Sequence, residues 1–428
     1  MVQTQITPGP SGVMTGKYSK EQLAWLEKAK SFAAAIPLNE VLASDKENTF
    51  RRDLFVKACQ EGFGALPFGP EFKSSLKNES ARAGGDYVSF ALINQEFARK
   101  VNPIMSSLGV HVLCQEPIYK FGSAEQKAKY LPLSASGEYL GAFGLTEPNA
   151  GSDTAAIETT ARLVGDEYIL NGTKTFITSG ASADFYIVMA RLLENKDDRK
   201  AESDTGSGAG SAASTHKAAS PATRSGKEIT AFIVERKFAG FEIGQKFDML
   251  GMRGYSTCEI VMNDCKVPRA NLLGAHGEGR KVALSSLSKG RVTIAAQCCG
   301  WAQGAFEAAS NLLQRYYRDG AIGADAGGHA GMLGDMTVAI EAARVLTFQA
   351  ARLIDAGEAS ITVAAMAKTV ASDTAMKTAG DCISLLGLEG LKPDLLIERI
   401  FRDAKAGQIY EGTNQIQRML IARDLLKP

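Results

Sequence analysis

The stretch Gln408-Ile409-Tyr410-Glu411-Gly412-Thr413-Asn414-Gln415-Ile416-Gln417-Arg418 is the most informative part of the chain. It sets one carboxylate, that of Glu411, among apolar neighbours beside a glycine turn. A carboxylate packed against Ile409 and Tyr410 loses hydration, so its pKa rises and it can remove a weakly acidic C–H proton near neutral pH. Taken alone, a Glu-Gly-Thr triplet is more often a helix cap, so the interpretation needs further motifs.

A second stretch, Gly141-Ala142-Phe143-Gly144-Leu145-Thr146-Glu147-Pro148-Asn149-Ala150-Gly151-Ser152-Asp153, joins a strand of small residues to a loop of hydroxyls, glycine and backbone donors. Such a loop suits a polar, planar ligand. Three shorter motifs lie between the two stretches: Lys174-Thr175-Phe176-Ile177-Thr178, Gly251-Met252-Arg253-Gly254 and Glu398-Arg399-Ile400-Phe401-Arg402-Asp403-Ala404. Together and in this order, the motifs closely resemble those of the acyl-CoA dehydrogenase family, and the resemblance covers nearly the whole chain.

The resemblance implies FAD-dependent α,β-dehydrogenation of an acyl-CoA thioester to the trans-2-enoyl-CoA, a step of fatty-acid β-oxidation. This reaction needs a base on one face of the substrate, a hydride acceptor on the other, and polarisation of the carbonyl. No amino acid accepts hydride, so a cofactor must, and the resemblance implies that it is FAD. Glu411 matches the base of most family members. A minority branch carries the base at the position of Gly290, and glycine cannot act as one.

The resemblance also assigns ligand contacts. Thr146 matches a residue that bonds the pyrimidine edge of the flavin, Thr178 matches one near N5, and Phe176 stands where the family usually has a tryptophan against the ring. The full set of cofactor-binding residues is Phe143, Leu145, Thr146, Gly151, Ser152, Phe176, Ile177, Thr178, Thr413 and Gln415. The substrate-binding residues are Ser152, Arg291 and Gly412. The alternative interpretations are structural. Phe176 would pack in the core, the threonine hydroxyls would lie on the surface of a strand, and Arg291 would form an ion pair on the surface of a helix.

The patterns predict an α+β fold with an N-terminal α-helical domain, a middle β-domain and a C-terminal α-helical bundle. The expected domains are residues 1–137, 138–268 and 269–428, the last a four-helix bundle. Apolar spacing predicts helices over residues 88–100, 292–317, 330–356 and 361–386, and β-branched runs predict strands at 168–170, 185–188 and 229–234. Asn171-Gly172 is a hairpin signal. Residues 194–227 have almost no apolar side chain, which predicts a flexible insertion that is either a tolerated surface loop or a docking loop.

Composition excludes several functional classes. The net charge is +1 and there is no basic stripe, so we expect no nucleic-acid partner. The seven cysteines form no CxxC, which fits reduced thiols in a bacterial cytoplasm or a mitochondrial matrix. The four histidines lack metal-site spacing, so we expect no metal, and no apolar run approaches membrane-spanning length.

The chain departs from the family at the surface that one subunit lends to the FAD of its neighbour. Tyr316 stands where the family usually has an arginine that binds the FAD pyrophosphate of the neighbouring subunit, and Asp319 stands where the family usually has a phenylalanine. In the turn Ser384-Leu385-Leu386-Gly387-Leu388-Glu389-Gly390 the family's glutamine and one glycine are missing, and Glu389 adds a negative charge. We therefore expect either a homo-oligomer, tetramer or dimer, with rearranged adenylate contacts, or pairing with a related subunit. The first expectation is the simpler.

The sequence favours a dehydrogenase that passes electrons to an electron-transfer flavoprotein, with a weak preference for short or branched acyl chains. An enoyl-CoA reductase running the reaction in reverse and an oxidase share the same fold. A structural subunit that holds little FAD is the alternative from another functional class. The small residues Gly290, Ala295 and Ala296 leave the depth of the acyl pocket open.

Overall fold

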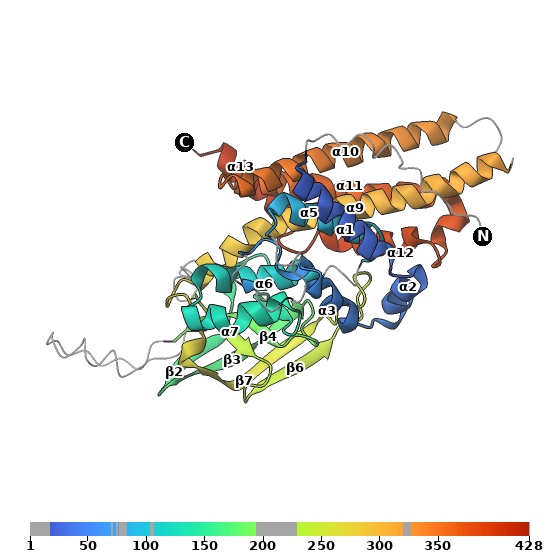
Figure 1. Ribbon diagram of the computed structural model, residues 1–428. Coiled ribbons are helices and arrows are strands. Elements are labelled where there is room, and N and C mark those ends of the chain that lie inside the picture. Colours follow the sequence, from blue (N-terminus) through green and yellow to red (C-terminus); the bar gives the residue numbers. More distant parts are fainter. Residues whose placement is uncertain are drawn as a thin grey trace.

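The computed structural model describes residues 18–69, 72–73, 76, 84–102, 107–193, 229–319 and 327–427. Helices come first along the chain, a β-sheet follows, and long helices complete it (Figure 1). The predicted α+β fold with a helical N-terminal domain, a β-domain and a helical C-terminal domain is confirmed. The insertion predicted at residues 194–227 lies outside the described residues.

The N-terminal helices begin at strong caps. Ser19 and Ser123 each form a capping box with a glutamine three residues on, at the starts of the first and last of these helices. The expected helix at residues 88–100 is confirmed as α5. The elements are α1 (Lys20–Ala34), α2 (Leu38–Glu47), α3 (Arg52–Gln60), the 3-10 turn η2 (Phe63–Ala65), α5 (Tyr87–Lys100), α6 (Ser107–Phe121) and α7 (Ala124–Ala135).

The β-domain is one mixed sheet. Its order is β6-β7-β3-β2-β4-β5-β8, with β1 pairing in parallel with β4. The strands are β1 (Gly141–Gly144), β2 (Thr160–Val164), β3 (Glu167–Ile177), β4 (Phe185–Leu192), β5 (Ile229–Glu235), β6 (Phe241–Lys246), β7 (Cys258–Pro268) and β8 (Leu272–Leu273). Every residue of β5 is buried, as expected for an apolar run deep in a sheet. The three predicted strands are confirmed within β3, β4 and β5.

The hairpin predicted at Asn171-Gly172 is wrong. These two residues lie inside β3, where the pairing with β7 shifts register between Leu170 and Gly172. Gly172 has φ +150°, and a Cβ there would lie 2.5 Å from Oγ1 of Thr159. The glycine therefore serves a bulge and a close contact. The chain reverses earlier, because Val164 pairs with Glu167 and leaves a two-residue loop.

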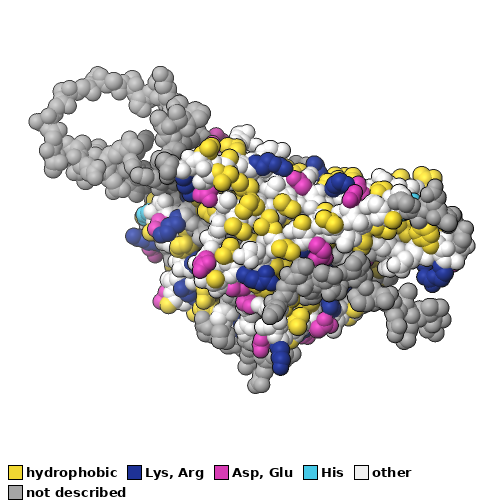
Figure 2. All heavy atoms as spheres, turned by 90° about the horizontal axis from the view of Figure 1, so that it is seen from above, with side chains coloured by type: hydrophobic (Ala, Val, Ile, Leu, Met, Phe, Trp, Pro, Cys, Tyr) yellow, Lys and Arg dark blue, Asp and Glu magenta, His cyan; other side chains and the backbone are white. Residues whose placement is uncertain are grey.

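The C-terminal helices pack around α9, which is longer than the predicted segment 292–317 because it already begins at Gly279. The elements are α9 (Gly279–Arg318), α10 (Gly327–Asp355), α11 (Ile361–Leu386), the 3-10 helix η7 (Gly387–Leu391), α12 (Leu396–Gly407) and α13 (Asn414–Leu425). Figure 2 looks down on this bundle and shows apolar side chains gathered on its outer face. Val338 and Val345 of α10 and Met419 of α13 are exposed apolar residues of the bundle.

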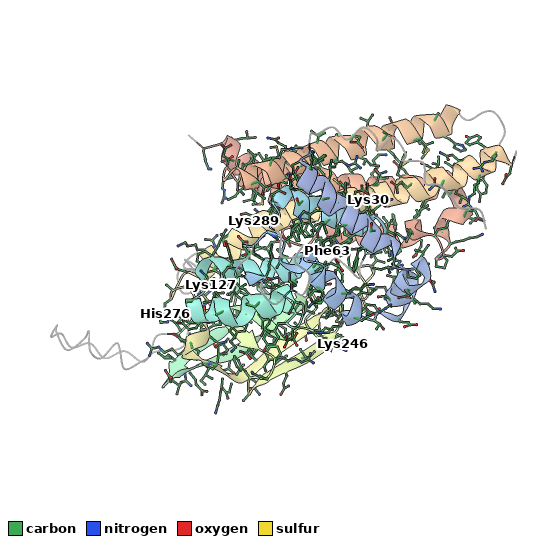
Figure 3. The ribbon with its side chains drawn as sticks, in the orientation of Figure 1. Lys30, Phe63, Lys127, Lys246, His276 and Lys289 are labelled. Atoms are coloured by element: carbon green, nitrogen blue, oxygen red, sulfur yellow. The ribbon has the colours of Figure 1, made fainter. Side chains whose placement is uncertain are left out.

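Helix α9 also packs against helix α5 of the N-terminal domain, and the two backbones approach closely at two glycines of α9. A Cβ at Gly300 would lie 2.1 Å from the carbonyl oxygen of Gln95 in α5, and one at Gly304 would lie 2.2 Å from that of Arg99. On the other side of α5, the ring of Phe63 packs edge-on against Phe97, with ring centroids 5.2 Å apart. Figure 3 labels Phe63 among the N-terminal helices. The two helical domains thus share one apolar core.

We propose a boundary between the N-terminal and β-domains near residue 137, between α7 and β1. The boundary expected at 268 falls before β8, which pairs with β5. We therefore propose that the β-domain extends to the start of α9. Among the described residues, no helix is both long and apolar enough to cross a membrane.

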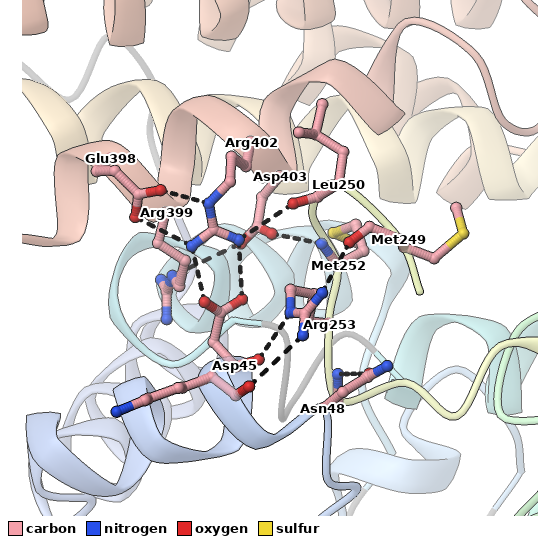
Figure 4. A network of polar contacts seen from close by, with 12 residues as sticks. Asp45, Asn48, Met249, Leu250, Met252, Arg253, Glu398, Arg399, Arg402 and Asp403 are labelled. Carbon is pink, nitrogen blue, oxygen red and sulfur yellow. Dashed lines mark hydrogen bonds and ion pairs between the residues drawn. The ribbon is translucent and has the colours of Figure 1, made fainter. Parts of the chain in front are cut away.

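A buried polar network joins the three domains (Figure 4). Asp403 of α12 accepts a hydrogen bond from the Met252 backbone N–H at 2.5 Å and one from the Asn102 amide at 2.9 Å. The guanidinium of Arg399 faces the same carboxylate, with Nε 3.6 Å from Oδ2, and both side chains are completely buried. Nearby, Arg402 binds the Asp45 carboxylate of α2 at 2.7 Å. The network fixes α12 relative to the other two domains.

We predict that Asp403→Leu destabilises the protein by roughly 3–5 kcal/mol, because it leaves the Arg399 guanidinium buried without a counter-charge. The double variant Arg399→Met/Asp403→Leu should cost less than Asp403→Leu alone, since no uncompensated charge remains. Urea unfolding followed by circular dichroism measures both. If the double variant were destabilised by more than Asp403→Leu alone, the predicted coupling between Arg399 and Asp403 would be contradicted.

Candidate functional site

Glu411 lies in the short loop between α12 and α13, in a strained backbone conformation. Its φ is +51° and that of Gly412 is +89°, so two successive residues are left-handed. A glutamate adopts this region only when its surroundings impose it, and such residues concentrate at functional sites. The Gln417 amide stabilises the loop, donating to the carbonyl oxygens of Glu411 at 3.1 Å and Gly412 at 2.8 Å.

The Glu411 carboxylate lies against the bare backbone of α9. A Cβ built on Gly290 would be 2.0 Å from Oε2 of Glu411, so only glycine leaves room for this carboxylate. Oε2 is buried and has no hydrogen-bond partner among the described residues. Burial raises the pKa of Glu411 to about 7, and the positive charges of Arg291 and Lys368 oppose that rise. The group can therefore exchange a proton near neutral pH.

The charge of Arg291 acts on this carboxylate and lowers its pKa. The Arg291 side chain is buried, its Nε has no hydrogen-bond partner among the described residues, and burial lowers its pKa while the Glu411 charge raises it. The alternative interpretation, an exposed ion pair on the helix surface, is excluded by this burial. Unpartnered polar atoms on both Arg291 and Glu411 indicate a place where a polar ligand completes the site.

Two small hollows lie against α9. One lies among α5, α6 and α9 and is lined by Gly290, Thr293, Tyr87 and Gly109, among others. The other lies between Leu145 and the first turns of α9 and includes Arg280. The hollow that includes Gly290 is next to the Glu411 carboxylate, because that carboxylate lies against Gly290.

The hollow that includes Gly290 has polar residues in its lining. The Tyr87 hydroxyl is 2.7 Å from the Thr293 hydroxyl and donates to the Lys289 carbonyl oxygen at 2.7 Å. The Lys289 ammonium pairs with Glu116 at 2.9 Å. These contacts tie together the three helices that line the hollow and limit its depth.

The aromatic residue expected to contact a flavin is available. Phe176, at the end of β3, has φ +55° and 57% of its surface exposed, and it stacks on Phe247 with ring centroids 4.8 Å apart. Thr178 lies two residues further along the same segment. Thr146 is joined to this region, because its carbonyl oxygen accepts a hydrogen bond from the Thr175 N–H at 2.9 Å. An exposed aromatic face beside strand-end hydroxyls fits a planar, polar ring system.

Beneath these hydroxyls lies a buried ion pair. Lys174 donates to Glu147 at 2.6 Å, and the carboxylate of Glu147 also accepts the Thr159 N–H at 3.0 Å. Burial lowers the pKa of Lys174 to about 8. The pair fixes the loop that follows β1, which contains Leu145 and Thr146.

The remaining predicted residues differ in their exposure. Gly151, Ser152 and Gln415 are exposed, Phe143 is half-buried, and Ile177 is buried. Thr413 caps α13, since its hydroxyl accepts the Ile416 N–H at 3.3 Å. The Thr413 hydroxyl therefore stabilises the start of α13.

The residues that depart from the family pattern in α9 and η7 have partners within the chain. Glu389 is paired with Lys392 at 2.7 Å, which neutralises the negative charge that the sequence adds there. Tyr316 packs against the apolar core. Arg315 and Arg318 remain in the last turn of α9.

Sequence reasoning missed several residues that hold the site. Lys368 and Asp373 of α11 bind the loop around Glu411 from the opposite side, and Tyr87 ends the hollow beside it. The available signal was a lone lysine on an alanine-rich helix face, where Ala364, Ala371 and Ala375 are also buried. That pattern is equally typical of a surface position.

Comparisons with known proteins identify the family of the chain. Models of the N-terminal, middle and C-terminal domains of acyl-CoA dehydrogenases match residues 19–138, 142–207 and 277–426. The chain is 37% identical over 384 residues to a short-chain specific acyl-CoA dehydrogenase of Clostridium acetobutylicum, covering 90% of this chain and 92% of that one. It is similar to butyryl-CoA dehydrogenase from Megasphaera elsdenii, with TM-score 0.83, 33% identity, and 97% and 100% coverage of the two chains.

A further similarity is to a chain in the structure reported for the electron transferring flavoprotein of Acidaminococcus fermentans. The TM-score is 0.83 and the identity 36%, covering 96% of this chain and 99% of that chain.

We predict that Gly290→Ala abolishes most of the activity while leaving the fold intact. The new methyl group would overlap the Glu411 carboxylate, which must therefore move, and a displacement of about 1 Å costs on the order of 100-fold in rate. Alanine is the better helix former, so α9 itself should persist. The matched control is Ser288→Ala, two residues away, where a hydroxyl that bonds its own helix is removed. Wild-type turnover of an acyl-CoA by Gly290→Ala would show that the carboxylate does not need this position.

Proposed function

The chain belongs to the acyl-CoA dehydrogenase family, and we propose that Glu411 is the base of its reaction, acting on a short acyl-CoA bound along α9. It is an oxidoreductase that dehydrogenates the α,β bond of an acyl-CoA thioester. The observation that carries the residue assignment is the buried Glu411 carboxylate against Gly290, with its pKa raised to about 7. An ionised carboxylate with no protein hydrogen bond on Oε2 is ready to accept a proton from a substrate carbon.

The chain's own residues account for binding and proton transfer. Glu411 removes the α-proton, and its backbone N–H polarises the thioester carbonyl. Arg291 provides positive charge beside the base and the developing enolate. We propose that Arg280, which lines the hollow beside Leu145, contacts the negatively charged part of CoA.

FAD, when bound, supplies the hydride acceptor that no side chain can provide. Its fit to this chain rests on the exposed face of Phe176 and on the segment around Thr178. We propose that these residues, with Thr146 and the loop through Ser152, hold the ring, and that Thr413 and Gln415 contact it from the loop that carries the base.

We propose that the substrate is a short-chain thioester. Tyr87 and Thr293, whose hydroxyls bond each other, line the hollow that includes Gly290, and we propose that they limit the length of the acyl tail. The resemblance to short-chain and butyryl-CoA dehydrogenases supports the same proposal.

We propose that the chain assembles as a homo-oligomer and passes electrons to an electron-transfer flavoprotein. Exposed apolar residues such as Val338, Val345 and Met419 on the bundle supply an area for self-association (Figure 2). The Glu389–Lys392 pair supports a self-sufficient adenylate region. The similarity to a chain in the electron transferring flavoprotein structure supports a flavoprotein acceptor.

Glu411→Gln is predicted to lower turnover by at least 100-fold, because it removes the base without changing the size of the side chain. The wild-type rate should rise as the pH passes about 7, since only the ionised carboxylate accepts a proton. Stopped-flow bleaching of the flavin by butyryl-CoA measures both. Retention of the yellow flavin spectrum is the control for folding, and it also separates the enzyme from a structural subunit. Near-normal bleaching in this variant would refute the assignment.

Tyr87→Ala is predicted to deepen the acyl pocket. The ratio of kcat/KM for octanoyl-CoA to that for butyryl-CoA should rise at least tenfold, since each buried methylene contributes about 0.8 kcal/mol. Tyr87→Phe is the matched control, because it removes the hydroxyl and retains the ring that closes the hollow. An unchanged ratio in Tyr87→Ala would place the acyl chain elsewhere.

A further inference from the structure

One face of α11 holds the loop that carries Glu411. The Lys368 ammonium donates to the carbonyl oxygen of Gly412 at 2.8 Å and to Oδ1 of Asn414 at 2.9 Å. One turn later, the Ser372 hydroxyl is hydrogen-bonded to the Asn414 side chain, whose amide nitrogen donates to it at 2.9 Å. Lys368 therefore fastens the residue directly after Glu411 to a rigid helix.

Asp373 fastens the two ends of the same loop. Its Oδ1 accepts hydrogen bonds from the Gln408 amide and the Asn414 amide, both at 2.7 Å, and its Oδ2 pairs with Arg418 at 2.9 Å. These contacts are near the surface, whereas the Lys368 side chain is completely buried. Of the two α11 side chains, only Lys368 reaches the left-handed part of the loop.

The burial of Lys368 is costly. Among the described residues it forms no ion pair within 4.0 Å, and both of its hydrogen-bond acceptors are neutral. Burial lowers its pKa to about 8, while the charges of Glu411 and Asp373 act to raise it. A buried ammonium without a paired carboxylate destabilises a fold, and an apolar side chain of similar length would fit the alanine-rich helix better.

Resting on the proposed function of Glu411, we propose that Lys368 is a positioning residue for the reaction: it holds Gly412 and Asn414 so that the Glu411 carboxylate faces Gly290, and it places a positive charge behind that carboxylate. The effect on catalysis is indirect, because Lys368 acts through the loop and through its field. It makes the left-handed conformation of Glu411 and Gly412 the stable one.

The charges that face Glu411 come from several elements. Arg291 of α9 and Lys368 of α11 are the cations that lower its pKa. The other titratable groups coupled to it are Tyr87 of α5, Cys114 of α6 and the neighbouring Tyr410, and burial raises the pKa of all three, which keeps them neutral. Removing the Lys368 charge therefore raises the pKa of Glu411 further above 7, so a higher pH is needed to ionise the base.

The test compares Lys368→Met with Lys377→Met. Methionine matches the length of lysine and removes both the charge and the donors, whereas Lys377 is an exposed lysine of the same helix that pairs with Asp381. Single-turnover flavin bleaching by butyryl-CoA is measured from pH 5.5 to 9 on the holoenzyme, with circular dichroism and flavin content as folding controls. Lys368→Met should lower the rate at neutral pH at least tenfold and move the pH midpoint upward by about one unit. Lys377→Met should match the wild type.

A purely structural role would reduce the rate at all pH values alike, so an unmoved midpoint in folded Lys368→Met overturns the proposal. If that variant does not fold, Lys368→Gln decides, because it keeps an N–H donor for Gly412 and loses only the charge. Its midpoint should also rise, and an unchanged one overturns the proposal as well. An active Glu411→Gln would instead refute the base assignment, so failure of the two ideas is distinguishable.

Discussion

Contact with the backbone of α9 is the constraint on which the rest of the structure depends. At Gly300 and Gly304 the helix lets the carbonyl oxygens of α5 come closer than any side chain would permit, and at Gly290 it admits the carboxylate of Glu411. The same helix therefore joins the helical domains and sets the position of the base. A packed interior resists even single added methyl groups, so these glycines fix distances that the loops alone could not hold.

Sequence reasoning predicted the domain order and Glu411 because both are local signals. Helical and strand periodicity can be read within a few turns, and Glu411 stands inside a motif with a glycine and apolar neighbours. The hairpin at Asn171-Gly172 was wrong because glycine serves both turns and bulges, and only the pairing with β7 distinguishes them. The predicted segment 292–317 misses the first turns of α9, because residues 285–291 are mostly polar and only Ser286, Gly290 and Arg291 of them are buried.

The residues that support the site were less accessible to prediction. Tyr87 ends the hollow because α5, α6 and α9 converge, and Lys368 reaches the loop because α11 crosses α12 and α13. Neither contact has a fixed spacing along the chain. A lysine in an alanine-rich helix has the same local pattern on a solvent-exposed face as on a buried one, so its role follows only from tertiary packing.

Asp403 and Glu411 are two buried carboxylates, eight residues apart along the chain, with different surroundings. Asp403 stabilises the fold, and we propose that Glu411 takes part in the reaction. The Asp403 carboxylate faces Arg399 and accepts two further hydrogen bonds, which fixes α12 among the three domains. The Glu411 carboxylate has cations around it but an unpartnered Oε2, and its pKa is raised to about 7. A carboxylate engaged like Asp403 would be a poor base, because both of its oxygens are occupied by donors and neither is free to accept a proton from a substrate. The buried network at Asp403 and the hydrogen bond from Lys368 to Gly412 therefore have a common consequence. They hold the Glu411 carboxylate, with its unpartnered Oε2, in a buried position. Because that burial raises the pKa of Glu411, the carboxylate keeps the proton affinity that a base needs.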